Sequence, residues 1–242
     1  VASAEHVADN VIQLRLVKPE GFTWKTGEFA RVGLKIEGDE VFRAYSIGSA
    51  PASETVDFYI ANVTGGILSP KLNQIKTGDS VLIDTEVGGM LLADRLEAGG
   101  KDLWLFASGT GVSPFLAVLS DESITSRFER LILVHGVRTW NETGYVSRLV
   151  KRSPKLTVVA CVTREKGAAV NERIPDALAD GSLERAELLR ERLEELDKEH
   201  SRVMLCGNPG MVKSVREAMK ARGIVSPRGG KPGQLLAENF WL

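Results

Sequence analysis

Residues 103–114 read LWLFASGTGVSP, an apolar run that leads directly into a glycine-rich turn ending in proline. A continuous apolar run of this length is typical of a strand buried on both faces of a parallel sheet. Gly109 and Gly111 allow the backbone to approach a ligand, and Pro114 suits the first position of a helix, where its missing N–H costs nothing. The stretch predicts a strand, a turn able to contact a ligand and the start of a helix.

Strand-like and helix-like segments alternate after this stretch. Further apolar runs occupy residues 131–135, 156–162 and 202–206. Helix-like segments separate the runs, at residues 114–119, 143–151, 183–200 and 209–222. Gly223 is well placed to end the last of these helices. Because strands that alternate with helices pair in parallel, this half of the chain predicts an α/β domain with its ligand site at the strand ends.

The preceding part of the chain has a different pattern of polar and apolar residues. Polar and apolar residues alternate over residues 11–17, 29–36, 56–63 and 80–84, with Gly and Pro turns between them. Short strands at this spacing predict a small antiparallel β-barrel, with one helix from Ser69 to residues 76–78. Residues 96–102 have the composition of a linker. We therefore expect an N-terminal antiparallel β-barrel domain over residues 1–97 and a C-terminal α/β parallel-sheet nucleotide-binding domain over residues 98–242.

The composition argues against several classes of protein. The chain has 242 residues with 31 basic and 32 acidic side chains, so no net field favours nucleic acid or an anionic membrane. No segment approaches the apolar length of a membrane span, and residues 1–10 lack the pattern of an export signal. Two cysteines do not suggest a disulfide scaffold. We expect a monomeric, cytoplasmic protein that binds neither nucleic acid nor a membrane.

Two further turns repeat the pattern of small residues before a proline. They are residues 65–70 (GGILSP) and 206–211 (CGNPGM). In each turn, as at residues 113–114, a Ser or Asn is placed to cap a helix and Pro to occupy its first position. Helix starts of this kind bind anions. The turn at residues 109–111 departs from the usual dinucleotide fingerprint, because Pro114 stands where a third glycine belongs.

Residues 43–46 read RAYS at the end of an expected strand. Arg43 could pair with a pyrophosphate, Tyr45 could stack on a flat ring system and the Ser46 hydroxyl could bond a ring nitrogen. An ordinary half-exposed strand would show the same four residues. Three anion sites together with an Arg and a Tyr predict a protein that binds two dinucleotides, a flavin and a nicotinamide coenzyme.

In this order and spacing, the RAYS, GGILSP, GTG and CGNP motifs resemble those of the bacterial ferredoxin–NADP+ reductases in the wider ferredoxin reductase family. The match runs over almost the whole chain. The resemblance implies an FAD-binding barrel followed by an NADP-binding α/β domain, with FAD and NADP(H) as cofactors. It also implies an enzyme that exchanges electrons between NADPH and a ferredoxin or flavodoxin. Two cysteines cannot hold a four-thiolate cluster, so the acceptor must be a separate protein.

The resemblance carries specific residues onto both cofactors. For the flavin it implies Arg43, Ala44, Tyr45, Ser46, Tyr59, Ile60, Ala61, Ile67, Leu68 and Ser69. For the nicotinamide nucleotide it implies Thr110, Val137, Arg138, Thr163, Arg164, Arg173, Gly207, Asn208 and Pro209. Phe240 and Trp241 match the family's aromatic C-terminus, but Leu242 follows them here, so which aromatic covers the flavin and which meets its adenine stays open.

The same resemblance gives a catalytic set of Ser46, Cys206 and Glu238, with Glu238 as a candidate proton relay. Cys206 has a plainer interpretation, because a cysteine at the end of an apolar strand is more often a small buried hydrophobe than a reactive thiol. His6, His135 and His200 lie far apart in the sequence with no ligand partner three or four residues away, so we expect no metal site.

The sequence leaves both the coenzyme and the exact reaction open. Arg138, Arg164 and Arg173 favour NADP because a 2′-phosphate needs cations, whereas Glu165 beside them could accept ribose hydroxyls as in NAD enzymes. The chain could also be a related NAD(P)H-dependent flavin, siderophore or oxygenase-component reductase. A binding module that keeps the fold without turnover would show the same motifs.

Overall fold

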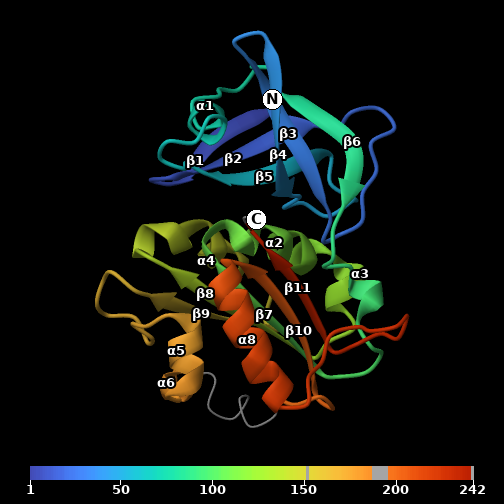
Figure 1. Ribbon diagram of the computed structural model, residues 1–242, viewed down its shortest axis with the longest axis vertical. Coiled ribbons are helices and arrows are strands. Elements are labelled where there is room, and N and C mark those ends of the chain that lie inside the picture. Colours follow the sequence, from blue (N-terminus) through green and yellow to red (C-terminus); the bar gives the residue numbers. More distant parts are fainter. Residues whose placement is uncertain (151–152, 187–195, 241–242) are drawn as a thin grey trace.

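The computed structural model describes residues 1–150, 153–186 and 196–240, with a strand-rich part above an α/β part (Figure 1). The N-terminal strands are β1 (Ser3–Ala8), β2 (Val11–Val17), β3 (Phe29–Ile36), β4 (Asp39–Ser46), β5 (Thr55–Ala61) and β6 (Leu82–Gly88). They form two three-stranded antiparallel sheets, in the orders β1-β2-β5 and β4-β3-β6. Leu14, Val32 and Phe58, from both sheets, are buried in one core. The antiparallel architecture is as predicted.

The helix predicted within this part is shorter than expected. α1 covers Ser69–Leu72, so the predicted end at residues 76–78 is wrong. The side-chain amide of Asn73 donates to the carbonyls of Ser69, at 2.9 Å, and Ile60, at 3.3 Å. An amide that bonds nearby backbone competes with helix propagation, and here it also fastens the segment to β5.

The C-terminal part is built on one parallel sheet. Its strands are β7 (Asp102–Ser108), β8 (Arg130–Val137), β9 (Leu156–Val162), β10 (Ser201–Gly207) and β11 (Leu235–Asn239), in the order β11-β10-β7-β8-β9. Its helices are α2 (Ser113–Ser120), α3 (Glu122–Thr125), α4 (Gly144–Val150), α5 (Ile174–Ala179), α6 (Ser182–Arg185) and α8 (Pro209–Ala221). Short 3-10 turns are η1 (Ala93–Arg95), η2 (Gly109–Val112) and η3 (Trp140–Thr143). The four predicted strands are present, and β11 is an addition that the sequence did not indicate.

Each face of this sheet has its own core. Phe115 of α2 and Tyr145 of α4 pack on one face, and Ala177 of α5 and Val215 of α8 on the other. Because apolar side chains alternate to both faces, every strand in the middle of the sheet needs the continuous apolar run that the sequence shows. The layers place the loops that follow β7, β8 and β10 against the barrel (Figure 1).

The helices match the sequence pattern unevenly. α8 ends just before Gly223, which has φ +77°, as predicted. The single helix predicted over residues 183–200 is wrong, because Ala186 has ψ 95° and ends α6. Ala186 is buried with Leu183 and Leu196 in one core, so tertiary packing overrides the helical pattern. Residues 187–195 and residue 151, which belonged to predicted helices, lie outside the described residues. None of the described helices is long and apolar enough to cross a membrane.

One buried cation fixes the connection between the two parts. Arg202 is 3% exposed, and its guanidinium donates to the carbonyls of Glu97, Ala98, Lys198 and Ser201 at 2.7 to 3.0 Å. A Cβ on Gly100, which has φ +81°, would lie 3.0 Å from the Arg202 Nη1. The connection therefore depends on a glycine for its path and on an arginine for its hydrogen bonds.

Candidate functional site

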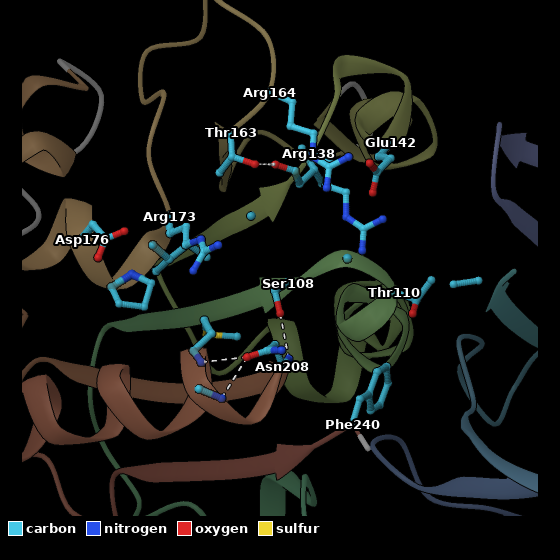
Figure 2. Close-up of a pocket in the computed structure, with 18 of the residues that line it drawn as sticks. Ser108, Thr110, Arg138, Glu142, Thr163, Arg164, Arg173, Asp176, Asn208 and Phe240 are labelled. Carbon is cyan, nitrogen blue, oxygen red and sulfur yellow. Dashed lines mark hydrogen bonds between the residues drawn. The ribbon is translucent and has the colours of Figure 1, made fainter. Parts of the chain in front are cut away.

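A cavity of about 690 Å³ opens between the two parts of the molecule (Figure 2). The barrel contributes Asn10, Val11 and Ala61 to its lining. The α/β part contributes residues that follow β7, β8, β9 and β10, together with Phe240. The cavity thus lies at the carboxyl ends of parallel strands, where open α/β sheets bind nucleotides. Within the described ranges, no three His, Cys, Asp or Glu side chains gather as a metal site.

The turns after β7 and β10 are packed against each other. A Cβ on Gly111 would lie 2.4 Å from the Cys206 carbonyl oxygen, so only glycine fits there. The backbone amide of Asn208 donates to the Ser108 hydroxyl at 2.9 Å. Gly207, between them, has φ +137°. Because both contacts are close, the two turns form one wall of the cavity, and Ser108 is a member that the sequence motifs did not indicate.

The predicted capping pattern holds at one helix start and fails at two. Asn208 caps α8, accepting from the amides of Gly210 and Met211, with Pro209 at the first helical position. Ser113 lies inside α2, because η2 already starts the turn before it, and Pro114 is its second residue. The same displacement occurs at α1, where Leu68 takes the cap position.

The two serine hydroxyls make tertiary contacts instead of caps. The Ser113 hydroxyl donates to the Ser46 carbonyl at 3.1 Å, which joins α2 to the end of β4. The Ser69 hydroxyl accepts from the Val63 amide at 3.1 Å. Partners brought by the fold therefore displaced the local hydrogen bonds that the sequence pattern predicted.

Three arginines that the sequence places far apart line the same cavity. Arg138 follows β8, Arg164 follows β9 and Arg173 precedes α5 (Figure 2). The ends of β8 and β9 are held together by the amide and hydroxyl of Thr163, which both donate to the Val137 carbonyl. Among the described residues, no carboxylate forms a salt bridge with any of the three arginines. Their positive charge is therefore available to an anion in the cavity.

The acidic residues near the arginines have different positions. Glu165 does not line the cavity, and its carboxylate accepts a hydrogen bond from the Trp140 amide at 2.5 Å. Glu142 and Asp176 do line it, and Figure 2 shows them on the side that carries the arginines. Glu165, the acidic neighbour considered from the sequence, is thus hydrogen-bonded to the backbone. Two other carboxylates, Glu142 and Asp176, lie near the three arginines.

The RAYS motif lies on β4, outside the cavity lining. Arg43 and Ala44 are exposed, Tyr45 is half-buried and Ser46 is buried. The Arg43 Nη1 donates to the adjacent Phe42 carbonyl at 2.7 Å, and no described carboxylate pairs with this side chain. Burial raises the pKa of Tyr45 to about 12, and the nearby Arg43 charge opposes that rise. The motif therefore presents an unpaired cation, a neutral phenol ring and a buried serine along one strand end.

The remaining barrel residues of the expected set are divided between surface and core. Ile67 is 61% exposed, whereas Leu68 and Ser69 are buried. Ile60 is fully buried in the barrel core, so its side chain faces away from any ligand. Ala61 is the one member of this group that lines the cavity.

Tyr59 makes an aromatic contact across the two parts. Its ring stacks on Tyr145 of α4 with 5.3 Å between centroids, and its hydroxyl accepts from the Gln13 side-chain amide at 3.0 Å. Burial, with a smaller effect of the Asp57 charge, raises the pKa of Tyr59 to about 12. Nothing in the sequence around Tyr145 indicated this contact, because the two rings are far apart along the chain.

Cys206 and Glu238 lie opposite each other on β10 and β11. Cys206 is fully buried, and burial, together with the nearby Glu238 charge, raises the pKa of its thiol. Burial also raises the pKa of Glu238, against the effect of the Met90 amide, which donates to Glu238 Oε2 at 2.9 Å. The thiol is thus held in its protonated form, while the carboxyl bridges β11 and the loop after β6.

Phe240, in the segment that follows β11, lines the cavity. Its ring is partly buried, and its backbone amide donates to the Gly207 carbonyl at 2.8 Å. Trp241, the other expected aromatic, lies outside the described residues. Of the expected nucleotide set, Thr110, Val137, Arg138, Thr163, Arg164, Arg173 and Asn208 line the cavity together with Phe240.

Family models match both parts of the chain. Residues 1–90 match the oxidoreductase FAD-binding domain, and residues 105–217 match the oxidoreductase NAD-binding domain. These two matches cover the barrel and most of the parallel sheet.

Curated relatives match the full length. A ferredoxin–NADP reductase of Pseudomonas aeruginosa is 32% identical, with 100% of this chain and 96% of the relative covered. A flavodoxin/ferredoxin–NADP reductase of Shigella flexneri is 34% identical, with 100% and 97% covered. Among solved structures, a ferredoxin NADP+ reductase from Neisseria gonorrhoeae with bound FAD and NADP is 31% identical, with a TM-score of 0.88 over 98% of this chain and 95% of that one.

Proposed function

The chain belongs to the ferredoxin–NADP reductase family of oxidoreductases, and we propose that it exchanges electrons between NADPH and a ferredoxin or flavodoxin through a bound FAD. The observation that carries the proposal is the cavity between the two parts, where three arginines without carboxylate partners among the described residues face the packed turns after β7 and β10. When bound, FAD supplies the exchange between a two-electron hydride donor and a one-electron carrier.

The barrel surface fits the flavin. Arg43 offers an unpaired guanidinium, and within the described ranges the amides of Ile67 and Leu68 donate to no carbonyl, so these groups can hold a pyrophosphate. Tyr45, kept neutral, can stack on the ring system. The Ser46 hydroxyl forms no hydrogen bond with a described residue and can donate to a ring nitrogen. The strand that carries Tyr59, Ile60 and Ala61 lies beside this surface. Ile60 would contribute only its backbone, because its side chain is in the barrel core.

The cavity fits a phosphorylated nicotinamide nucleotide. Arg138, Arg164 and Arg173 would bind the 2′-phosphate, with Val137 and Thr163 beside the adenosine. Thr110 and the turn of Gly207, Asn208 and Pro209 would hold the nicotinamide end. Because Glu165 is bonded to the Trp140 amide, it is poorly placed to select the ribose hydroxyls of NADH.

Three residues would act next to the reacting groups. Ser46 orients the flavin by its hydroxyl, and Cys206, buried and protonated, supports from beneath the turn that would hold the nicotinamide. Glu238 is the proton relay: the Met90 amide holds its Oε2, which leaves Oε1 to carry a proton, and its raised pKa favours the protonated form. One of the two terminal aromatics, Phe240 or Trp241, would exclude water from the exposed flavin face, and the other would meet the adenine.

We also propose the domain boundary between residues 97 and 98, with a C-terminal tail that reaches back to the flavin. We further propose a monomer that resides in the cytoplasm, and the two free, buried cysteines agree with a reducing compartment. Limited proteolysis should cut between residues 96 and 102 only after unfolding, because Arg202 holds the carbonyls there. Size-exclusion chromatography with light scattering tests the monomer, and a mass of two chains would contradict it.

A steady-state comparison of acceptors tests the function. The FAD-loaded protein is given NADPH and, in parallel, a ferredoxin, a flavodoxin, free FMN or a ferric siderophore. We expect NADPH oxidation to be fastest with one of the two carrier proteins. Faster turnover with free FMN or the siderophore would assign the chain to a related reductase, and no NADPH oxidation with any acceptor would indicate a binding module.

A further inference from the structure

His135 is a buried polar residue beside the cavity that the proposed reaction does not use. It lies near the end of β8, is 1% exposed and has its Nε2 at 2.9 Å from the Gly109 carbonyl oxygen. Gly109 is the first residue of η2 and has φ +55°. The imidazole therefore contacts the turn at the point where the chain leaves β7.

The sheet is built to accommodate this ring. In the register of the parallel strands, His135 lies between Ala107 of β7 and Ala160 of β9. Methyl side chains on both neighbours leave room for an imidazole between them. The ring of Tyr145 meets it edge-on, with 6.5 Å between centroids. Packing from three elements thus fixes the direction in which Nε2 points.

The hydrogen bond requires one tautomer. A carbonyl oxygen can only accept, so the proton must be on Nε2. Among the described residues Nδ1 has no partner, and it is buried. Burial lowers the pKa of His135 to about 4, against the opposing effect of the Gly109 carbonyl, so the ring is neutral at neutral pH. An unpaired buried acceptor is destabilising, and an apolar side chain would avoid that cost.

The bond to Gly109 has consequences for the cavity wall. Thr110, the next residue, lines the cavity. Ser108, just before this turn, contacts Asn208, and Gly111, within it, contacts Cys206. A shift of the Gly109 carbonyl would therefore move the surface against which the nicotinamide end of the coenzyme would bind.

We propose that His135 is a positioning residue for the nicotinamide coenzyme, which holds the Gly109–Val112 turn in its binding shape by donating Nε2–H to the Gly109 carbonyl. This role rests on the proposed function, because it takes the coenzyme to bind in the cavity. It assigns His135 no contact with substrate and no part in proton transfer.

A matched pair of variants tests the donor. In His135→Gln the amide nitrogen reaches about as far as the imidazole Nε2 and can donate to the same carbonyl. In His135→Met the chain has similar length but no donor. We expect the dissociation constant for NADP+, measured by calorimetry on the FAD-loaded protein, to rise about tenfold in His135→Met and less than threefold in His135→Gln. The KM for NADPH should follow, with kcat at saturation changing less than twofold.

Several results would overturn the proposal. They are equal loss of NADP+ affinity in both variants, unchanged affinity in a folded His135→Met, or a fall in kcat without a change in KM. His6→Gln, on the exposed strand β1, is the control and should match the wild type. A wild type that binds NADP+ but reduces no acceptor would contradict the proposed function alone, because affinity does not depend on turnover.

A second measurement needs no variant. Nitrogen NMR of the wild-type imidazoles should show a buried histidine in the Nε2–H tautomer whose signal moves when NADP+ is added. A buried histidine with its proton on Nδ1 would overturn the proposal even if the Met variant does not fold.

Discussion

Glu238 on β11 accepts a hydrogen bond from the Met90 backbone amide at 2.9 Å, and this contact joins the parallel sheet to the loop that leaves the barrel. A Cβ on Gly89 would lie 2.7 Å from the Gly27 carbonyl oxygen and 3.5 Å from Glu238 Oε2, so the loop is tightly enclosed. The carboxyl is buried enough for its pKa to be raised. Glu238 thus combines a structural contact with a titration that pH can probe.

The first prediction concerns the pH dependence of stability. Because the folded-state pKa of Glu238 is raised, its stabilising effect is present below the usual glutamate pKa and is lost as pH rises through the folded value. Glu238→Gln can still accept from Met90 but cannot ionise. We expect the melting temperature of wild type to fall relative to Glu238→Gln between acidic and neutral pH. Exposed Glu217→Gln is the control, and parallel curves for wild type and Glu238→Gln would refute the prediction.

The second prediction concerns the flavin. Arg43→Ala should weaken FAD binding by about 2 kcal/mol, roughly thirtyfold, because a charge-assisted contact to a pyrophosphate is lost. FAD affinity is measured by fluorescence titration of the apoprotein. Arg31→Ala is the matched control, since Arg31 already pairs with Asp84 on the neighbouring strand and should not bind the cofactor. If the two variants hold FAD equally well, Arg43 does not contact it.

The third prediction concerns coenzyme choice. The double variant Arg164→Ala, Arg173→Ala should lose NADPH efficiency while NADH efficiency barely changes. Each lost contact to phosphate costs about 1.5 to 3 kcal/mol, so a tenfold to hundredfold rise in NADPH KM per arginine is expected. Arg216→Ala, exposed on α8 and outside the cavity, serves as the control. Equal loss with both coenzymes, or a wild type that prefers NADH, would show that the arginines do not select the 2′-phosphate.

The fourth prediction concerns the connection between the parts. Arg202→Met should lower the free energy of unfolding by about 3 kcal/mol or more, because four carbonyls lose a charged donor in a buried place. Arg202→Lys should recover only part of this, since one ammonium cannot reach all four carbonyls. Denaturant unfolding of the FAD-loaded protein measures the change, with exposed Arg228→Met as control. A loss no larger than that of the control would refute the role of Arg202.

The strands of the parallel sheet were predictable because their burial on both faces leaves a continuous apolar run, and β9 has the predicted bounds Leu156–Val162. β1 and β11 were not, because half of the six residues of one are polar and the other is short. The predicted helix lengths were also wrong where a tertiary contact determines the end of the helix. Examples are the hydrogen bond from Asn73 to Ile60 and the burial of Ala186. Local patterns contain no information about such partners.

The candidate site was predictable in part for the same reason. Arg138, Arg164 and Arg173 follow from their positions at strand ends and helix starts, which parallel topology brings to one edge. His135, Ser108 and Tyr145 did not follow, because their partners Gly109, Asn208 and Tyr59 are known only once the chain is folded. The predicted caps at Ser69 and Ser113 were wrong. A hydroxyl next to a proline suggests a helix cap, but in the fold both hydroxyls bond to tertiary partners instead.

The most direct test of the central claim is a sequential stopped-flow experiment without oxygen. FAD-loaded protein is first mixed with NADPH, and the reduced protein is then mixed with oxidised ferredoxin or flavodoxin while flavin absorbance is followed. We predict that NADPH bleaches the flavin faster than NADH does, and that the carrier protein restores its colour faster than free FMN at the same concentration. A flavin that stays oxidised with NADPH, or a reduced protein that passes electrons to free FMN faster than to either carrier, would contradict the account.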